Sequence, residues 1–62
     1  MKLQRSWDGQ RNRYDVYDKF ETWRGTVDKT DHHGWKATND QGTLVAQYLD
    51  TKEAAASFLV ED

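Results

Sequence analysis

The sequence predicts an α+β fold, in which an antiparallel meander of three to four strands packs against one C-terminal α-helix in the order β-β-β-α. Two observations predict it. Apolar and polar residues alternate over residues 13–28 and 35–49, and a helix-start signal followed by strong helix formers occupies residues 50–59. Because 62 residues are too few for two hydrophobic cores, we expect one small domain over residues 13–62.

Residues 1–12 are mostly polar and predict a flexible basic arm. The same residues also allow an additional strand. Asp8-Gly9 is a favoured pair for a two-residue hairpin turn, which would pair residues 3–7 with residues 10–14. The arm and the extra strand are therefore alternatives for this segment.

Alternation after the arm predicts four strands, or three if the first is frayed. They cover residues 13–20, 22–28, 35–38 and 43–49. Strict alternation places Trp23, Gly25 and Val27 on one face of the second strand. The last three strands are separated by turn-forming residues at 29–34 and 39–42.

A helix is predicted over residues 53–59. Asp50 has the short oxygen side chain of an N-cap, and Glu53 stands three residues later, as in a capping box. On a 3.6-residue period Ala55, Phe58 and Leu59 share one face, which should lie on the sheet. We expect residues 60–62 to fray, because acids at a helix C-terminus oppose its dipole.

The strands and the helix together define a predicted core. We expect its aromatic rings to converge between sheet and helix and to leave no enclosed cavity for chemistry. The core residues are Val16, Trp23, Val27, Trp35, Ala37, Leu44, Ala46, Tyr48, Ala55, Phe58 and Leu59.

The sequence holds no catalytic or cofactor-binding motif, and we expect a protein that is not an enzyme and has no cofactor or small-molecule substrate. Ser6 and Ser57 have no histidine in a plausible triad. Cysteine is absent, and His32 and His33 lack a third ligand at zinc-like spacing. We therefore interpret His32 and His33 as part of a solvated turn that binds no metal. The alternative is a weak surface metal site that also includes Asp31.

No apolar run approaches the roughly 20 residues of a membrane span, and no signal peptide is recognisable. The absence of cysteine is compatible with a reducing compartment. We therefore expect a cytoplasmic protein with no membrane partner.

The outward face of the sheet is the candidate binding site, because it should carry polar side chains and two cations on rigid strands. A β-sheet can enter the DNA major groove, where arginine reads guanine and threonine contacts the thymine methyl group. The same residue types are also common on a solvated sheet face. The candidate residues are Tyr17, Thr22, Arg24, Thr26, Lys36 and Thr38.

The order TWRGTV, then GWKAT, then a strand ending in LDTKEAAASFL resembles the AP2-like domains that bind arm sites at the N-termini of phage and transposon integrases. The resemblance covers residues 22–59 and consists of a Trp-bearing strand followed by a helix start of this kind. It implies that the sheet face binds the major groove through Arg24, Lys36 and Thr38. The chain would then be a stand-alone relative without the integrase catalytic domain.

The distribution of charge along the chain helps to decide between a DNA partner and a protein partner. Residues 1–13 carry a net charge of +3 and residues 14–62 carry −5. DNA binders draw affinity from neutralised phosphates, so the acidic body would repel DNA and only the arm could compensate, for example by tracking a minor groove. The cations of the basic arm are Lys2, Arg5, Arg11 and Arg13.

A protein partner is therefore favoured over DNA. The first hypothesis is a small viral or mobile-element protein that docks on a host protein and changes its activity, helped by exposed aromatic residues. An edge strand such as 43–49 could also pair with a partner or form a homodimer. The alternative is a stand-alone AP2-like DNA-binding module that uses the sheet face and the basic arm.

Overall fold

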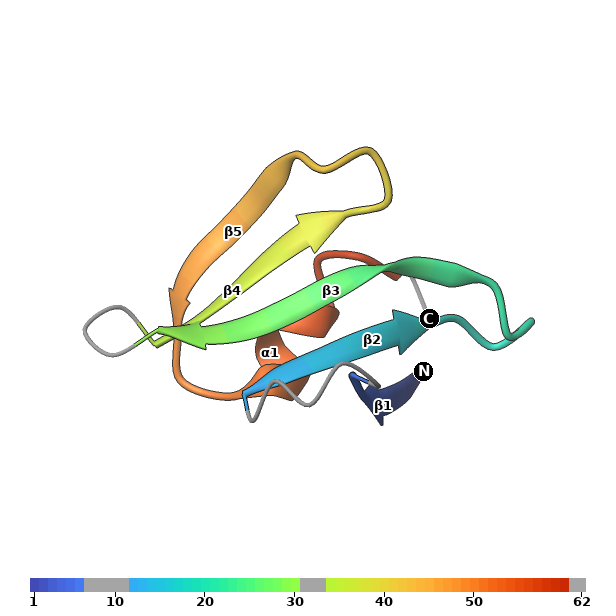
Figure 1. Ribbon diagram of the computed structural model, residues 1–62, viewed down its shortest axis with the longest axis horizontal. Coiled ribbons are helices and arrows are strands. Elements are labelled where there is room, and N and C mark those ends of the chain that lie inside the picture. The colour runs from blue at the N-terminus through green and yellow to red at the C-terminus, as the bar shows by residue number, and fades with distance from the viewer. Residues whose placement is uncertain (7–11, 31–33, 61–62) are drawn as a thin grey trace.

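The computed structural model describes residues 1–6, 12–30 and 34–60, which form an antiparallel sheet and one short helix (Figure 1). The strands lie in the sheet in the same order as in the chain, so the described residues form a five-stranded meander. The α+β class is thereby confirmed, with one strand more than the three to four strands predicted for the meander after residue 12. The elements are β1 (Lys2–Arg5), β2 (Arg13–Tyr17), β3 (Trp23–Thr30), β4 (Gly34–Asn39), β5 (Leu44–Leu49) and α1 (Lys52–Ala56).

The additional strand is β1, which forms one edge of the sheet beside β2. Its residues belong to the sheet and not to a free arm. Leu3 lies opposite Val16, whereas the predicted two-residue turn would place Leu3 opposite Tyr14. The pairing is thus shifted by two residues, which keeps Leu3 on the same face because side chains alternate with a period of two. The residues of that turn, Asp8 and Gly9, lie outside the described residues.

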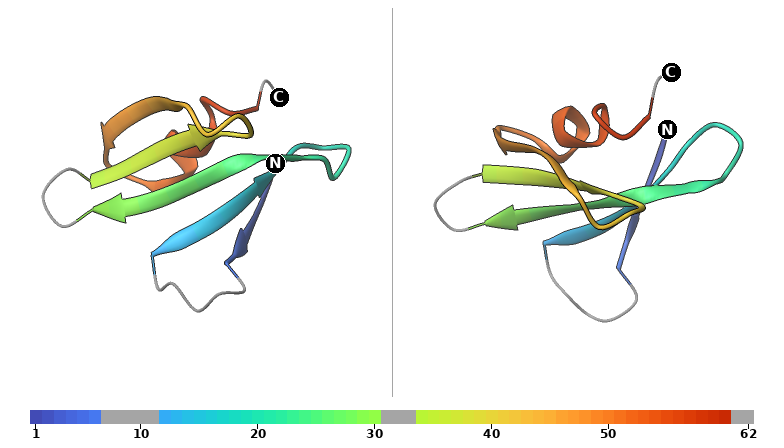
Figure 2. Two further views of the ribbon diagram at one scale, coloured as in Figure 1. Left: turned by 45° about the horizontal axis from the view of Figure 1, so that its top comes forward. Right: turned by 90° about the horizontal axis from the view of Figure 1, so that it is seen from above.

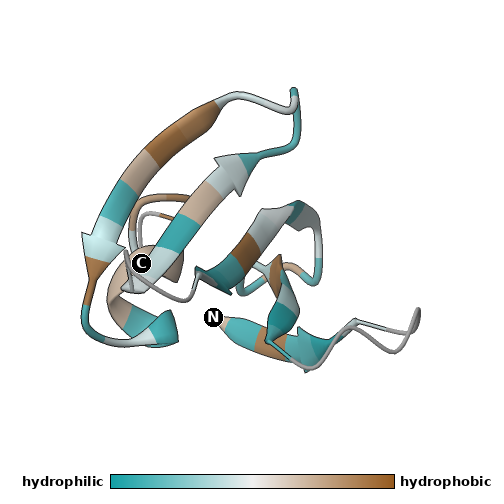
Figure 3. Cartoon of the chain, turned by 60° about the vertical axis from the view of Figure 1, so that its left-hand side comes forward, coloured by the Kyte–Doolittle hydropathy of each residue, from teal (hydrophilic) through white to brown (hydrophobic). Residues whose placement is uncertain are grey.

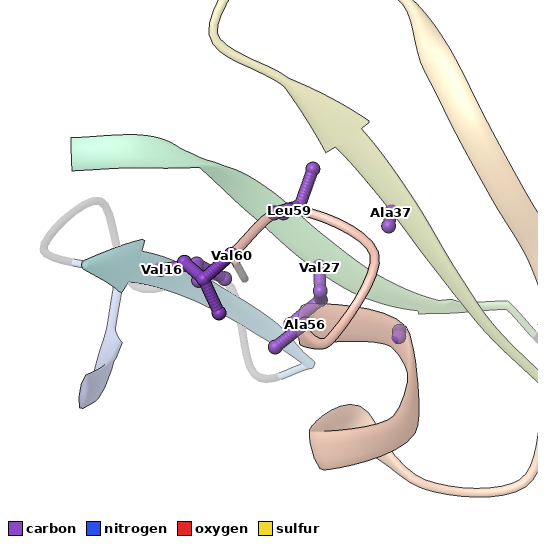
Figure 4. Close-up of a cluster of buried hydrophobic side chains, with 7 residues drawn as sticks. Val16, Val27, Ala37, Ala56, Leu59 and Val60 are labelled. Carbon is purple, nitrogen blue, oxygen red and sulfur yellow. The ribbon is translucent and has the colours of Figure 1, made fainter. Parts of the chain in front are cut away.

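Helix α1 covers one face of the sheet, where it packs against β3, β4 and β5 (Figure 2). Val16 and Val27 are the largest fully buried side chains. The other members of the buried cluster are small or come from the C-terminal segment, and small side chains allow the helix to approach the sheet closely. The cluster comprises Val16, Val27, Ala37, Ala55, Ala56, Leu59 and Val60, and is surrounded by the partly buried Leu3, Tyr14, Trp35, Ala46 and Leu49 (Figure 4).

The core is aliphatic, and the predicted convergence of four aromatic rings is wrong. Only Trp35 packs at the border of the core, with its ring centroid 6.0 Å from that of Tyr14. Trp23, Tyr48 and Phe58 are 43%, 63% and 59% exposed. Each of the three is displaced by a local irregularity of the backbone that strict periodicity does not anticipate.

A bulge in β3 explains the exposure of Trp23. Val16 lies opposite Gly25, but the next residue, Tyr17, lies opposite Trp23, so Arg24 is an extra residue in β3. An extra residue breaks the alternation of side chains between the two faces. Trp23 therefore joins the face opposite α1, while Gly25 remains on the core side.

Two register shifts in β5 move Leu44 and Tyr48 out of the core. Ala46 and Leu49 both pack against the core although they are three residues apart, a spacing that puts residues of a regular strand on opposite faces. Tyr48 lies between them with a φ of 67°, in the left-handed region. The prediction that Leu44, Ala46 and Tyr48 share the inner face is correct only for Ala46.

Helix α1 begins close to the predicted position. Its N-cap is Thr51, whose hydroxyl oxygen accepts a hydrogen bond from the Ala54 N–H at 3.1 Å. The cap is thus one residue later than the predicted Asp50. Threonine has the short oxygen side chain that N-caps require, so the chemistry of the prediction holds.

The helix ends earlier than predicted, and its end exposes Phe58. After Ala56, the N–H groups of Phe58 and Leu59 donate to carbonyl oxygens three residues back, in a tighter turn than that of an α-helix. This turn changes which side chains meet the sheet. Leu59 and Val60 are buried, so the expected fraying of residue 60 is wrong, as is the placement of Phe58 on the sheet.

Candidate binding surfaces

The sheet face opposite α1, here named the open face, carries four of the six predicted binding residues. Thr26 lies directly opposite Thr38, and cross-strand partners share a face, but Thr26 is only 7% exposed and is therefore not accessible to a partner. Lys36 is two residues from Thr38 and therefore lies on the same face, as does Tyr17 opposite Trp23. The open face comprises Lys2, Gln4, Arg13, Asp15, Tyr17, Trp23, Thr26, Asp28, Lys36, Thr38 and Leu44.

The other two predicted residues, Thr22 and Arg24, are not brought together with these four. Thr22 precedes β3, and its N–H donates to the Asp18 carboxylate at 3.0 Å. Arg24 is the extra residue of the β3 bulge and lines a hollow beside the C-terminal segment. The two cations of the predicted patch, Arg24 and Lys36, thus belong to different surfaces.

Cations and carboxylates alternate across the open face. The Arg13 Nε lies 3.7 Å from the Asp28 Oδ1, and Asp28 in turn lies opposite Lys36. Asp15 lies between β1 and β3, where it faces Gln4 and Thr26. With Lys2 as the remaining cation, the positive and negative charges of the open face nearly cancel.

The structure describes three of the four cations of the predicted basic arm, and they lie on two strands. Lys2 and Arg5 belong to β1, Lys2 on the open face and Arg5 opposite a residue of the core side. Arg13 belongs to β2 and lies beside Asp28. Arg11 lies outside the described residues. The described cations are therefore held in the sheet, and binding of this segment to a groove of DNA stays a prediction.

Apolar side chains are exposed among the polar residues of the open face. Trp23 lies opposite Tyr17, and Leu44, which is 48% exposed, lies opposite Thr38. Hydrophilic and hydrophobic residues are mixed along the strands (Figure 3). Periodicity alone assigned both Trp23 and Leu44 to the core. The signal that could have found the displacement of Trp23 is Gly25, because a glycine inside a strand often marks a bulge.

A second surface, here named the groove, is lined by the β2–β3 loop and the C-terminal segment. Both segments lie toward the same end of the molecule (Figures 1 and 2). Its volume is ≈ 420 Å³. Sequence reasoning missed it, because it placed Phe58 in the core. The residues that line the groove are Asp18, Lys19, Phe20, Arg24, Phe58, Leu59 and Val60.

Asp18 organises the loop that forms one wall of the groove. Its Oδ1 accepts hydrogen bonds from the N–H groups of Phe20 at 2.8 Å and Thr22 at 3.0 Å. The Thr22 N–H, helped by the Phe20 N–H and the charge of Arg24, lowers the pKa of Asp18 below its ordinary value, although desolvation opposes the shift. The carboxylate is thus ionised and engaged by the backbone of its own loop.

Other predictions concern residues or properties away from these two surfaces. Asp31, His32 and His33 lie outside the described residues, so the predicted solvated turn stays a prediction. No helix within the described ranges is long and apolar enough to cross a membrane. No family model, no curated protein and no solved structure matches this chain.

Proposed function

We propose that the protein acts without catalysis, by binding another protein through the open face. The observation that carries this proposal is the exposure of Trp23 and Leu44 on a sheet face whose charges nearly cancel. Tryptophan and tyrosine are enriched among the residues that dominate interface energies, and polar residues typically surround them as a rim. Side chains on paired strands are also held in place before binding, which reduces the entropy lost on association.

DNA binding by the same face is the alternative. Lys2, Arg13 and Lys36 share the open face with Thr38, which favours it, although the neighbouring Thr26 is buried. However, DNA affinity grows with the number of phosphates that cations neutralise, and Asp15 and Asp28 stand among these cations. The resemblance to AP2-like integrase domains assigns base reading to Arg24, which lines the groove instead. That resemblance and a viral or mobile-element origin stay predictions.

Dimerisation through β5 has less support. β5 is an edge strand, as the homodimer hypothesis requires. Its two register shifts disturb the regular spacing that an added strand would need. We therefore place the docking surface on the open face and not on this edge.

The proposal predicts that Trp23→Thr weakens partner binding by about 2 kcal/mol or more, or roughly 30-fold, the cost of removing a central aromatic residue from an interface. Threonine keeps a high strand propensity, so the sheet should be retained. In contrast, Lys36→Gln should weaken binding by less than about 1 kcal/mol, as exposed ion pairs do. The partner would be captured on immobilised protein from nuclease-treated lysate, and its affinity for each variant measured by surface plasmon resonance.

Far-UV circular dichroism and thermal melting of both variants provide the folding control. Full partner affinity of a folded Trp23→Thr variant would contradict the proposal. The DNA alternative would be supported by a DNA gel shift that is present at about 50 mM salt, lost at about 300 mM salt, and weakened by Lys36→Gln.

A further inference from the structure

Two phenylalanines from distant parts of the sequence line the groove and remain open to solvent. Phe20 lies in the β2–β3 loop and is 76% exposed, and Phe58 lies in the turn that follows α1. Burying a phenylalanine side chain removes a large apolar surface from water, which is favourable. A ligand that covers both rings would therefore bury exposed apolar surface of Phe20 and of Phe58 in one groove.

The β2–β3 loop holds Phe20 in this position without a ligand. The Asp18 N–H donates to the Thr22 carbonyl oxygen at 3.0 Å, and the Glu21 N–H donates to the Asp18 carbonyl oxygen at 2.9 Å. The Asp18 carboxylate accepts the Phe20 N–H as well. These bonds close the loop on itself, so little backbone entropy would be lost on binding.

The lining of the groove carries two cations and one ionised carboxylate, so its net charge is positive. Lys19 and Arg24 both line it and are exposed, and the Lys19 Nζ lies 5.4 Å from the centroid of the Phe20 ring. Among the described residues no ion pair joins either cation to a carboxylate. The one carboxylate in the lining, that of Asp18, accepts backbone N–H groups. A positive groove on a chain of net charge −2 is complementary to an anionic ligand.

We propose that the groove binds a short peptide segment of a partner protein, in which an apolar side chain is flanked by carboxylates. The apolar side chain contacts Phe20 and Phe58, and the carboxylates pair with Arg24 and Lys19. The volume of ≈ 420 Å³ lies in the lower part of the range for ligand sites, about 300–1,000 Å³. Because the groove is open on one side, it suits a few side chains of a passing chain.

The probe is the peptide acetyl-Ser-Asp-Glu-Leu-Asp-Glu-Ser-amide, titrated into the isotope-labelled full chain in low salt and followed by amide chemical shifts. We expect shifts concentrated in residues 18–21 and 57–60 and at Arg24. A control peptide with Asn and Gln in place of Asp and Glu should bind several-fold more weakly. Arg24→Gln should weaken binding of the acidic peptide about tenfold, since charge-assisted hydrogen bonds to guanidinium are the strong ones.

Phe20→Ser tests the apolar contact. Because Phe20 is so exposed, its side chain can be removed without loss of the fold. This substitution should also weaken binding of the acidic peptide. Lys36→Gln and Trp23→Thr on the open face should leave peptide affinity unchanged. Failure at the groove and failure at the open face are therefore distinguishable.

Several outcomes would overturn the groove proposal. These are absence of shifts at millimolar peptide, equal binding of the uncharged peptide, or shifts that lie on the open face. Tighter binding of a single-stranded oligonucleotide to the same residues would identify a nucleic acid instead. Concentration-dependent shifts at the groove without any peptide would identify a second copy of the chain as its occupant.

Discussion

Replacing Gly25 by alanine is expected to destabilise the domain by at least about 3 kcal/mol, a large part of a stability that is only about 5 kcal/mol in a small domain. Gly25 has a φ of 140°, which L side chains rarely adopt. A Cβ at this position would overlap the Thr38 carbonyl oxygen and lie 2.9 Å from the Asn39 Cα. Both belong to β4, so the substitution forces the central strands β3 and β4 apart.

Gly42→Ala is the matched control. Gly42 also has a positive φ, of 82°, but a Cβ there would meet nothing within 4 Å. We expect the backbone strain alone to cost about 1 kcal/mol, which lowers the melting temperature by about 4–8 °C. For Gly25→Ala the fall should be at least about 12 °C on the same scale. Thermal melting followed by circular dichroism measures both, and equal melting temperatures would contradict the bulge geometry.

Ala56→Leu is expected to have the second largest effect on stability. Ala56 is fully buried in the cluster that contains Val16 and Val27 (Figure 4). A larger side chain there must push α1 away from the sheet, and overpacking of this kind costs about 1–3 kcal/mol. Urea denaturation should therefore show a lower midpoint with an unchanged slope.

Glu53→Leu inserts the same side chain into the same helix at an exposed position. It removes a favourable charge from the first turn, so we expect a loss below about 1 kcal/mol. If Ala56→Leu were no more destabilising than Glu53→Leu, the close contact between helix and sheet would be wrong.

The features that the sequence predicts correctly are those that depend on short-range pattern. Val16, Val27 and Ala37 are buried where alternation places them, and α1 begins at a short oxygen side chain followed by helix formers. Antiparallel pairing of neighbouring strands also follows from short connections. In each case the residue and its immediate neighbours carry the information.

The features that the sequence does not predict depend on single extra residues. One additional residue at Arg24 moves Trp23 to the other face, and register shifts in β5 expose Leu44 and Tyr48 in the same way. Such shifts are selected by pairing with β2 and β4, which a count along one strand cannot include. Gly25 indicates that the strand contains a bulge, but it does not indicate which side chain the bulge moves to the other face.

The candidate sites follow the same division. Tyr17, Thr26, Lys36 and Thr38 share the open face because their segments alternate regularly. Arg24 and Phe58 line the groove because a bulge and a tight turn displace them. Hydrophobic periodicity therefore could not predict the groove, because residues that line the groove depart from the regular pattern.

The bulge in β3 places Trp23 on the open face, where it is available to a partner. Nuclear Overhauser contacts of the Trp23 indole protons test this most directly in the free protein. The structure predicts contacts with the ring protons of Tyr17, its cross-strand neighbour. Contacts with the methyl groups of Ala55 or Val27 would instead place Trp23 in the core and contradict the proposed docking surface.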